Sequence, residues 1–263
     1  MTSASAVDLV ADIGEGFGAY RMSDDDALLE IISAANIACG FHAGDPRTMA
    51  YTVERCAAQN VSVGAHPSFP DRVGFGRRDM GLHPHEVETD TLYQIGALSG
   101  FARAVGVPIS HVIPHGRLGN LVVERADYAT AVAEAVHRFD RTIAIGAQEG
   151  ELRRAARARD LPLVTVGFID RAYEPNGQLR HRRHPDAVLH DAGAIVERAI
   201  RMVADGEIEA TDGTVLRVDV GALLLHGDNP GALTIARAVR TGLESAGVQI
   251  GGRFAAASAS ERR

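Results

Sequence analysis

The strongest constraint on the fold of this chain is a regular alternation between short apolar runs and longer segments of helical period. Such alternation is typical of βαβ units, whose parallel strands form one sheet that helices cover. The runs of strand length are residues 7–11, 36–39, 61–65, 110–113, 142–145, 163–168 and 220–225. The segments of helical period are residues 24–34, 46–59, 84–105, 126–139, 149–159, 191–204 and 230–246. We therefore expect an α/β protein built from seven strand–helix units.

The length of the chain favours one closed barrel over two separate domains. A β/α barrel of the TIM type uses about 250 residues as a single domain, and this chain has 263 residues, 46% of them hydrophobic. No linker or low-complexity tract divides the sequence. We predict a closed parallel β/α barrel of about seven strands over residues 7–250, a disordered stretch at 1–6, and a C-terminal tail at 251–263 that is frayed from residue 255.

The charge of the chain argues against a nucleic-acid partner. The sequence has 34 acidic and 27 basic residues, a formal charge of −7, and its one basic cluster, residues 180–184, is short. All the basic residues are arginine, so neither a Schiff base nor a lysine that holds phosphate is available.

The cysteines and the hydropathy pattern predict a cytoplasmic protein. Cys39 and Cys56 are too few for a disulfide framework in a chain of this size, which fits a reducing compartment. No apolar run approaches the roughly 18 residues that a membrane span needs, and the first six residues do not resemble a signal peptide. We expect no membrane partner.

Two helix starts are marked by a capping side chain followed by proline. Asp45 precedes Pro46, and Asn229 precedes Pro230. Proline suits the first helical position because its missing N–H would have no partner there. We therefore expect Asp45 and Asn229 to be N-caps.

Ionisable residues follow at least six of the predicted strands, at the point where each strand ends. They are Asp12 and Glu15, His42 and Asp45, His66, His115, Asp170 and Arg171, and His226 and Asp228. In a β/α barrel these strand ends form one rim, where active sites are built. A lone histidine there is often only a hydrogen-bonded turn residue. Four of the 11 histidines at equivalent positions favour a functional pocket instead.

The residue types at this rim are compatible with two kinds of chemistry. Asp12, His42, His66 and His115 could hold a divalent metal ion with a position left open for water. Without a metal, the same four residues and Glu15 could act as general acids and bases. Further candidates for substrate binding are Asn36, Asp45, Arg77, Arg78, Asp170, Arg171, His226 and Asp228. The guanidinium groups of Arg77 and Arg78 would match a carboxylate or a phosphate, unless they belong to a solvated surface loop.

Several runs of residues resemble the LamB/YcsF family, which is identified with the A subunit of ATP-dependent 5-oxoprolinase. They are DLVADIGEGFG at 8–18, ANIACGFHAGDP at 35–46, GAHPSFPD at 64–71, GFGRR at 74–78, YQIGAL at 93–98, PHG at 114–116, DRAY at 170–173 and HGD at 226–228. The resemblance implies a seven-stranded relative of the eight-fold barrel, akin to carbohydrate deacetylases. It also implies partner subunits of the B and C type, which couple ATP hydrolysis to the opening of 5-oxoproline into glutamate. Carried over, Asp12, His42, His66 and His115 are the pocket residues.

The chain departs from the family pattern at four positions. Val10, Ile113, Gly119 and Val166 stand where the family usually has Asn, Lys, Tyr and Glu. Apolar side chains at 10, 113 and 166 would give the pocket a more apolar floor and a less polar or larger substrate than 5-oxoproline. Three functions therefore stay open: a component of 5-oxoprolinase, a metal-dependent amidohydrolase or deacetylase (or a paralogue acting on another lactam or amide), and a non-catalytic binding subunit.

Overall fold

The computed structural model describes residues 6–229 and 231–260 of the chain. Its strands are β1 (Ala6–Ile13), β2 (Ala34–Ala38), β3 (Ser62–His66), β4 (Ile109–Val112), β5 (Ala144–Ala147), β6 (Leu163–Phe168), β7 (Glu207–Glu209), β8 (Val215–Arg217), β9 (Ala222–Leu225) and β10 (Gln249–Ile250). Its helices are α1 (Asp25–Leu29), α2 (Pro46–Gln59), α3 (Pro84–Ala104), α4 (Gly116–Glu124), α5 (Ala126–Phe139), α6 (Glu151–Arg157), α7 (Ala192–Ala204), α8 (Ala232–Ser245) and α9 (Arg253–Ser260).

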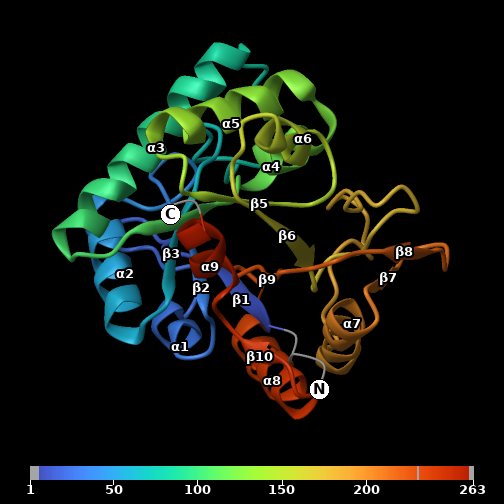
Figure 1. The fold of residues 1–263 in the computed structure, drawn as a ribbon. Coiled ribbons are helices and arrows are strands. Elements are labelled where there is room, and N and C mark those ends of the chain that lie inside the picture. The colour runs from blue at the N-terminus through green and yellow to red at the C-terminus, as the bar shows by residue number, and fades with distance from the viewer. Residues whose placement is uncertain (1–5, 230, 261–263) are drawn as a thin grey trace.

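Seven parallel strands form the closed barrel that the sequence predicts. They follow one another in the order β1, β2, β3, β4, β5, β6 and β9, and β9 pairs with β1 to close the ring (Figure 1). The helices pack around the outside, while β10 extends β1 as an extra parallel strand. The hairpin β7–β8 lies apart from the barrel as a small antiparallel sheet.

The alternation of side chains along each strand places the polar rim directly above an apolar interior. One apolar cluster comprises Val10, Ala34, Ile113, Ala144, Val164, Val166, Ala222, Leu224 and Phe254. Two residues after Val10, Ala34, Ile113 and Leu224, in the strands or just past their ends, stand Asp12, Asn36, His115 and His226, all of them buried. Because successive side chains on a strand point to opposite faces, positions two apart share a face. The strand pattern itself therefore aims these polar groups inward.

The structure differs from the sequence-based predictions at several element boundaries. The helix predicted at 24–34 ends early, at Leu29 in α1, because Ala34 already pairs as the first residue of β2. Helix α4, the hairpin β7–β8 and β10 were not predicted. No helix among the described residues is long and apolar enough to cross a membrane.

One of the two predicted N-caps is confirmed. The side chain of Asp45 accepts hydrogen bonds from the N–H groups of Arg47 and Thr48 at the start of α2. The prediction for Asn229 is wrong, because α8 begins later, with Gly231 as its N-cap. Pro230 lies outside the described residues. The side-chain oxygen of Asn229 instead accepts a hydrogen bond from the N–H of Gly231, at 3.1 Å.

The described part of the C-terminal tail contains a helix, where the sequence predicts a frayed end. Helix α9 contacts β1, β4, β5 and β6, so it lies across one end of the barrel (Figure 1). Phe254 is fully buried in the apolar interior and stacks on His111, with ring centroids 4.0 Å apart. The prediction failed because the sequence does not show that the barrel leaves an open end to fill. The predicted disorder at 1–6 falls outside the described residues, except that Ala6 begins β1.

Candidate functional site

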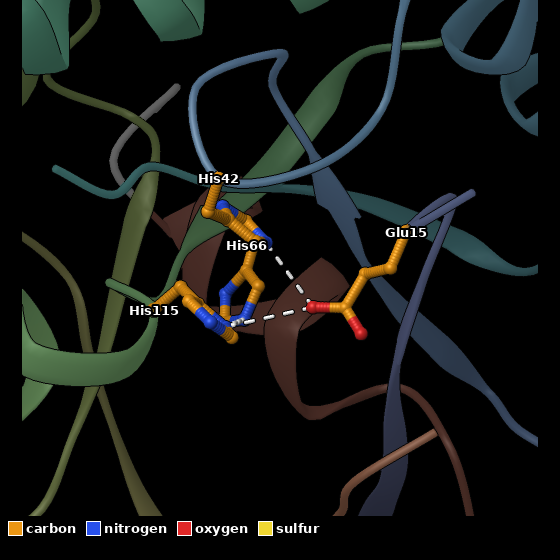
Figure 2. Close-up of side chains that lie close together, drawn as sticks. All are labelled: Glu15, His42, His66 and His115. Atoms are coloured by element: carbon orange, nitrogen blue, oxygen red, sulfur yellow. Dashed lines mark hydrogen bonds and ion pairs between the residues drawn. The ribbon is translucent and has the colours of Figure 1, made fainter. Parts of the chain in front are cut away.

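Four side chains from four different strand ends meet above the barrel interior (Figure 2). Glu15 follows β1, His42 follows β2, His66 ends β3 and His115 follows β4. Their ligand atoms all lie within 4.8 Å of one another, and all four residues are buried. Glu15 Oε1 lies 3.1 Å from His42 Nε2 and 3.5 Å from His115 Nδ1, as the dashed lines show. The rings of His42 and His115 stack at 3.8 Å.

Backbone carbonyls fix the direction in which two of the imidazoles point. His66 Nδ1 lies 2.6 Å from the oxygen of Ile113, and His115 Nε2 lies 2.9 Å from the oxygen of Phe75. A carbonyl only accepts, so each of these nitrogens donates. The other two nitrogens, His66 Nε2 and His115 Nδ1, are 3.0 Å apart. Two acceptor nitrogens at this distance require a proton or a cation between them.

Asp12 lies beside this cluster and is held by a chain of buried polar groups. Its Oδ1 accepts a hydrogen bond from Asn36 Nδ2 at 2.8 Å and lies 3.3 Å from His66 Nε2. Asn36 Oδ1 therefore faces His111 Nε2, which donates to it at 3.0 Å. His111 Nδ1 is 2.8 Å from the hydroxyl of Ser110. Burial lowers the pKa of His111 to about 3, so the ring is neutral and Nδ1 accepts from Ser110.

The carboxylates of Asp12 and Glu15 have opposite pKa shifts. Burial would raise the pKa of Asp12, but the charge of His66 and its hydrogen bond outweigh burial and lower the pKa. Burial, and then the negative charge of Asp12, raise the pKa of Glu15 well above its usual range. Two neighbouring carboxyl groups whose pKa values are driven apart are suited to hold one charge and one proton.

The histidines next to Glu15 are driven toward their neutral forms. Burial, and then the neighbouring His66, lower the pKa of His42 well below its usual value. Burial, and then His42, do the same for the pKa of His115. Neutral imidazole is the form that binds a metal ion.

A glycine in the loop after β3 lets the chain close over these rings. A Cβ at Gly76 would lie 2.2 Å from Ser68 Oγ and 2.9 Å from both His115 Cδ2 and His42 Cβ. Gly76 also has φ +65°, a conformation that glycine adopts without strain. Any larger side chain would push this loop away from the cluster.

A cavity of about 220 Å³ opens beside the cluster. Asp12, His66, His115 and His226 line its polar side. Its apolar side is formed by residues from β4, β6 and β9 and the segments next to them, chiefly Ile113, Val166, Phe168 and Leu224. A concave site with an apolar wall and a few converging polar groups is typical of a small-molecule site.

Five further residues predicted from the rim lie around this cavity. His226 Nδ1 is 2.9 Å from Asp170 Oδ1, so its Nε2 is left for other partners. Arg77 lines the cavity and pairs with Asp228 at 2.6 Å. Arg171 also lines it, but two of its donors bond to backbone oxygens of the loop after β6.

Asn36, Asp170 and Asp228 contact residues of the cavity lining without lining it themselves, whereas two other predicted substrate-binding residues, Asp45 and Arg78, have partners elsewhere. Asp45 caps α2 and also accepts a hydrogen bond from the N–H of Gly18 at 2.7 Å. Arg78 pairs with Asp71, and its side chain is 61% exposed. The structure therefore gives both residues a structural partner, in agreement with the simpler explanations that the sequence left open.

The departures from the family pattern lie at or just beneath the cavity. Ile113, Gly119 and Val166 line it, as the sequence predicts for 113 and 166. The prediction is wrong for Val10, which belongs to the apolar cluster of the barrel interior and does not line the cavity. A Cβ on Gly146, in β5, would lie 2.6 Å from Ile113 and 3.2 Å from Val166. The lysine and glutamate that the family usually has at 113 and 166 would therefore be neighbours. Because this chain has apolar residues at both positions, no unpaired buried charge is left.

The sequence did not single out His111 or Arg182. His111 stands in a strand next to Ser110, and its ring occupies space left by Gly64, where a Cβ would come within 2.0 Å of it. The available signal was the even spacing between His111 and His115, because residues an even number of positions apart on a strand point to the same face. Arg182 lines the cavity from the loop after β6, and its place in the basic run at 180–184 was the only signal in the sequence.

The cluster of Glu15, His42, His66 and His115 fits a divalent transition-metal ion. Three imidazoles and a carboxylate are ligands that zinc and similar ions prefer. Ligand atoms around tetrahedral zinc stand about 3.3 Å apart, close to the separations of 3.0 Å, 3.1 Å and 3.5 Å found here for three of the pairs. Backbone carbonyls orient two of the rings, as is usual around metals. The cluster shares three residues with the predicted metal set, but Glu15 takes the place of Asp12.

Comparison with known proteins places the chain in a family. The model of the LamB/YcsF family matches residues 7–258. The 5-oxoprolinase A subunit of Methylococcus capsulatus is 48% identical over 248 residues, which cover 94% of this chain and 95% of that protein. The third 5-oxoprolinase A subunit of Pseudomonas syringae pv. tomato is 45% identical over 246 residues, or 93% of this chain and 96% of that protein. The crystal structure of a lactam utilization protein from Thermus thermophilus has a TM-score of 0.88 at 44% identity, covering 93% of this chain and 98% of that one. The chain therefore belongs to the LamB/YcsF family.

Proposed function

We propose that this chain is the A subunit of an ATP-dependent 5-oxoprolinase, which opens the lactam of 5-oxo-L-proline to L-glutamate together with subunits of the B and C type. The observation that carries the proposal is the buried cluster of acids and bases beside a cavity of small-molecule size. Relatives that match over nearly their whole length carry the name of the 5-oxoprolinase A subunit, which supports this substrate.

Two histidines are placed to move the protons of the reaction. Opening a lactam adds the oxygen of water to the carbonyl carbon, breaks the C–N bond and gives the ring nitrogen a proton. When no metal ion occupies His66 Nε2, this nitrogen can take the proton from water, and the charge of Asp12 stabilises the imidazolium that forms. His226, tied to Asp170 through Nδ1, can deliver a proton from Nε2 to the ring nitrogen. Both rings line the cavity.

A metal ion, when bound, would be held by Glu15, His42, His66 and His115 and would polarise the amide carbonyl or lower the pKa of water. With or without a metal ion, Asn36 keeps the carboxylate of Asp12 turned toward His66.

The proposed use of ATP implies a role for partner subunits. The sequence has no lysine and no GxxxxGK[ST] run, so it lacks the usual P-loop that cradles phosphates. We assign the coupling of ATP hydrolysis to the assembly with B and C type subunits.

We expect the purified chain alone to release no measurable glutamate from 5-oxoproline with ATP, and the chain mixed with B and C type subunits to release glutamate and ADP together. The measurement is the time course of both products. Robust ATP-dependent glutamate release by the single chain would contradict the need for partners. An assembly that folds and assembles but never opens 5-oxoproline would contradict the substrate.

We expect Zn²⁺ affinity of the isolated chain to rise with pH. A raised pKa keeps the proton on Glu15, and the metal must displace that proton, so affinity falls by up to about tenfold per pH unit below the pKa. Calorimetry in two buffers of different ionisation enthalpy measures the released proton. Glu15→Gln should weaken binding and remove this proton, whereas Glu54→Gln, on the exposed side of α2, should not. Affinity that is independent of pH would argue against Glu15 as a ligand.

The second candidate is a metal-dependent amidohydrolase that acts on a less polar amide without partners. The apolar wall of Ile113, Val166 and Leu224 favours it, since such a wall tolerates bulkier substrates. Hydrolysis of a bulkier lactam by the chain with Zn²⁺ alone, in the absence of ATP, would establish this function instead.

A further inference from the structure

The basic run at residues 180–184 contributes directly to the cavity. It lies in the loop between β6 and α7, on the side of the barrel where the strands end (Figure 1). His181 and Arg182 of this run line the cavity together with Arg77 and Arg171. The run is too short to bind nucleic acid, so its position over a small-molecule cavity suggests another use.

Buried contacts hold this loop in place. Arg171 is only 4% exposed, and its Nε and Nη2 donate to the backbone oxygens of Ala187 at 3.0 Å and Arg180 at 2.6 Å. The side chain of Arg180 pairs with Glu174 at 3.0 Å and with Asp186 at 2.8 Å. A loop tied at several points offers Arg182 at a fixed position, which lowers the entropy lost when a ligand binds.

Arg182 is the arginine of the cavity without a partner among the described residues. Arg77 pairs with Asp228 at 2.6 Å, Arg117 pairs with Asp79 at 3.3 Å, and Arg171 bonds to the loop. Arg182 is half-buried, and it makes no hydrogen bond or ion pair with any other described residue. A partly buried charge without a partner loses hydration and gains nothing in return. An anion in the cavity would supply what it lacks.

The other charged residues around the cavity also favour an anionic ligand. Four arginines line it, against a single carboxylate among its described lining residues, that of Asp12. Burial, and then the nearby charge of Arg77, lower the pKa of Arg182, while the charges of Asp228, Asp170 and Asp12 act in the opposite direction without bonding to it. Because Asp12 already faces His66 and Asn36, it is not free to neutralise Arg182.

We propose that Arg182 binds the carboxylate of the substrate, while the hydrocarbon part of the substrate packs against Ile113 and Val166 and its amide faces His66. This inference rests on the proposed function and names the residue that would select a carboxylated lactam. Arginine is suited to the role because its planar fork matches both carboxylate oxygens. The cavity therefore has separate places for the charged, apolar and reacting parts of one small molecule.

The test compares lactams that differ only in the carboxylate. The wild-type chain should bind 5-oxoproline more tightly than 2-pyrrolidinone by calorimetry, and Arg182→Gln should weaken 5-oxoproline by about 10- to 100-fold, with no change for 2-pyrrolidinone. Arg182→Lys should recover part of the loss, because it keeps the charge but not the fork. Arg183→Gln is the matched control, since Arg183 is exposed and does not line the cavity.

The binding measurements decide the inference without relying on turnover. If Arg182→Gln weakens both lactams equally, Arg182 only orders the loop and the inference is overturned. A wild-type chain without a preference for 5-oxoproline, including one that binds neither lactam, overturns it too, as does Arg182-dependent binding of inorganic phosphate without that preference. If the carboxylate preference depends on Arg182 but the complete assembly never opens 5-oxoproline, the proposed function fails while the carboxylate site stands.

Discussion

His66→Ala is expected to reduce kcat of the assembled enzyme by about 10²- to 10⁴-fold, the range for loss of a general acid or base. His66 lines the cavity and contacts both Asp12 and His115, because its Nε2 lies 3.3 Å from Asp12 Oδ1 and 3.0 Å from His115 Nδ1. Alanine removes that nitrogen and leaves Asp12 Oδ1 without its contact to the imidazole. The measurement is steady-state kinetics with partner subunits and ATP.

The control for this variant is His85→Ala. His85 lies exposed in the first turn of α3 and belongs neither to the cluster nor to the cavity lining, so we expect its loss to leave kcat unchanged. Circular dichroism of both variants separates a catalytic loss from unfolding. A folded His66→Ala enzyme with near wild-type kcat would exclude His66 from the proton transfers.

Phe254→Ala is expected to lower the free energy of unfolding of the isolated chain by about 3–5 kcal/mol, as for other buried aromatic side chains. Phe254 is fully buried in the barrel interior, and its ring stacks on His111. Its removal leaves a void at the end of the barrel that α9 covers. The measurement is urea unfolding followed by circular dichroism.

A second substitution at the same position serves as the control. Phe254→Leu keeps most of the volume, so it should cost less than about 1.5 kcal/mol. The N–H of Phe254 also donates to Asp8 Oδ2 at 2.8 Å, and neither substitution removes this backbone bond. Equal stability of Phe254→Ala and wild type would show that α9 does not contribute to the core.

The same interior position links the C-terminal helix to the site. Phe254 packs on His111, His111 donates to Asn36, and Asn36 donates to Asp12. Ser258 of α9 donates to the backbone oxygen of Ser110 at 2.7 Å, beside the same strand. Helix α9 thus supports the groups that orient Asp12 from below, although it lies at the opposite end of the barrel from the cavity.

The sequence by itself determined the barrel and most of the polar rim. Strand alternation is a local property, so the step of two from Val10 to Asp12 and from Leu224 to His226 already placed the polar residues on the inner face. The cap at Asp45 was equally local, since the side chain bonds to N–H groups two and three residues away.

Among the described residues, only the tertiary structure shows which side chains have an ion-pair or hydrogen-bond partner and which have none. Arg77 and Arg78 are adjacent, yet one pairs with Asp228 in the segment after β9 and the other with Asp71 in its own loop. Arg182 became a cavity residue, and Phe254 a core residue, only when the loop after β6 and the C-terminal helix folded onto the closed barrel. Contacts between residues far apart in the chain depend on the closure of the ring and the paths of its loops, and neither leaves a periodic mark in the sequence.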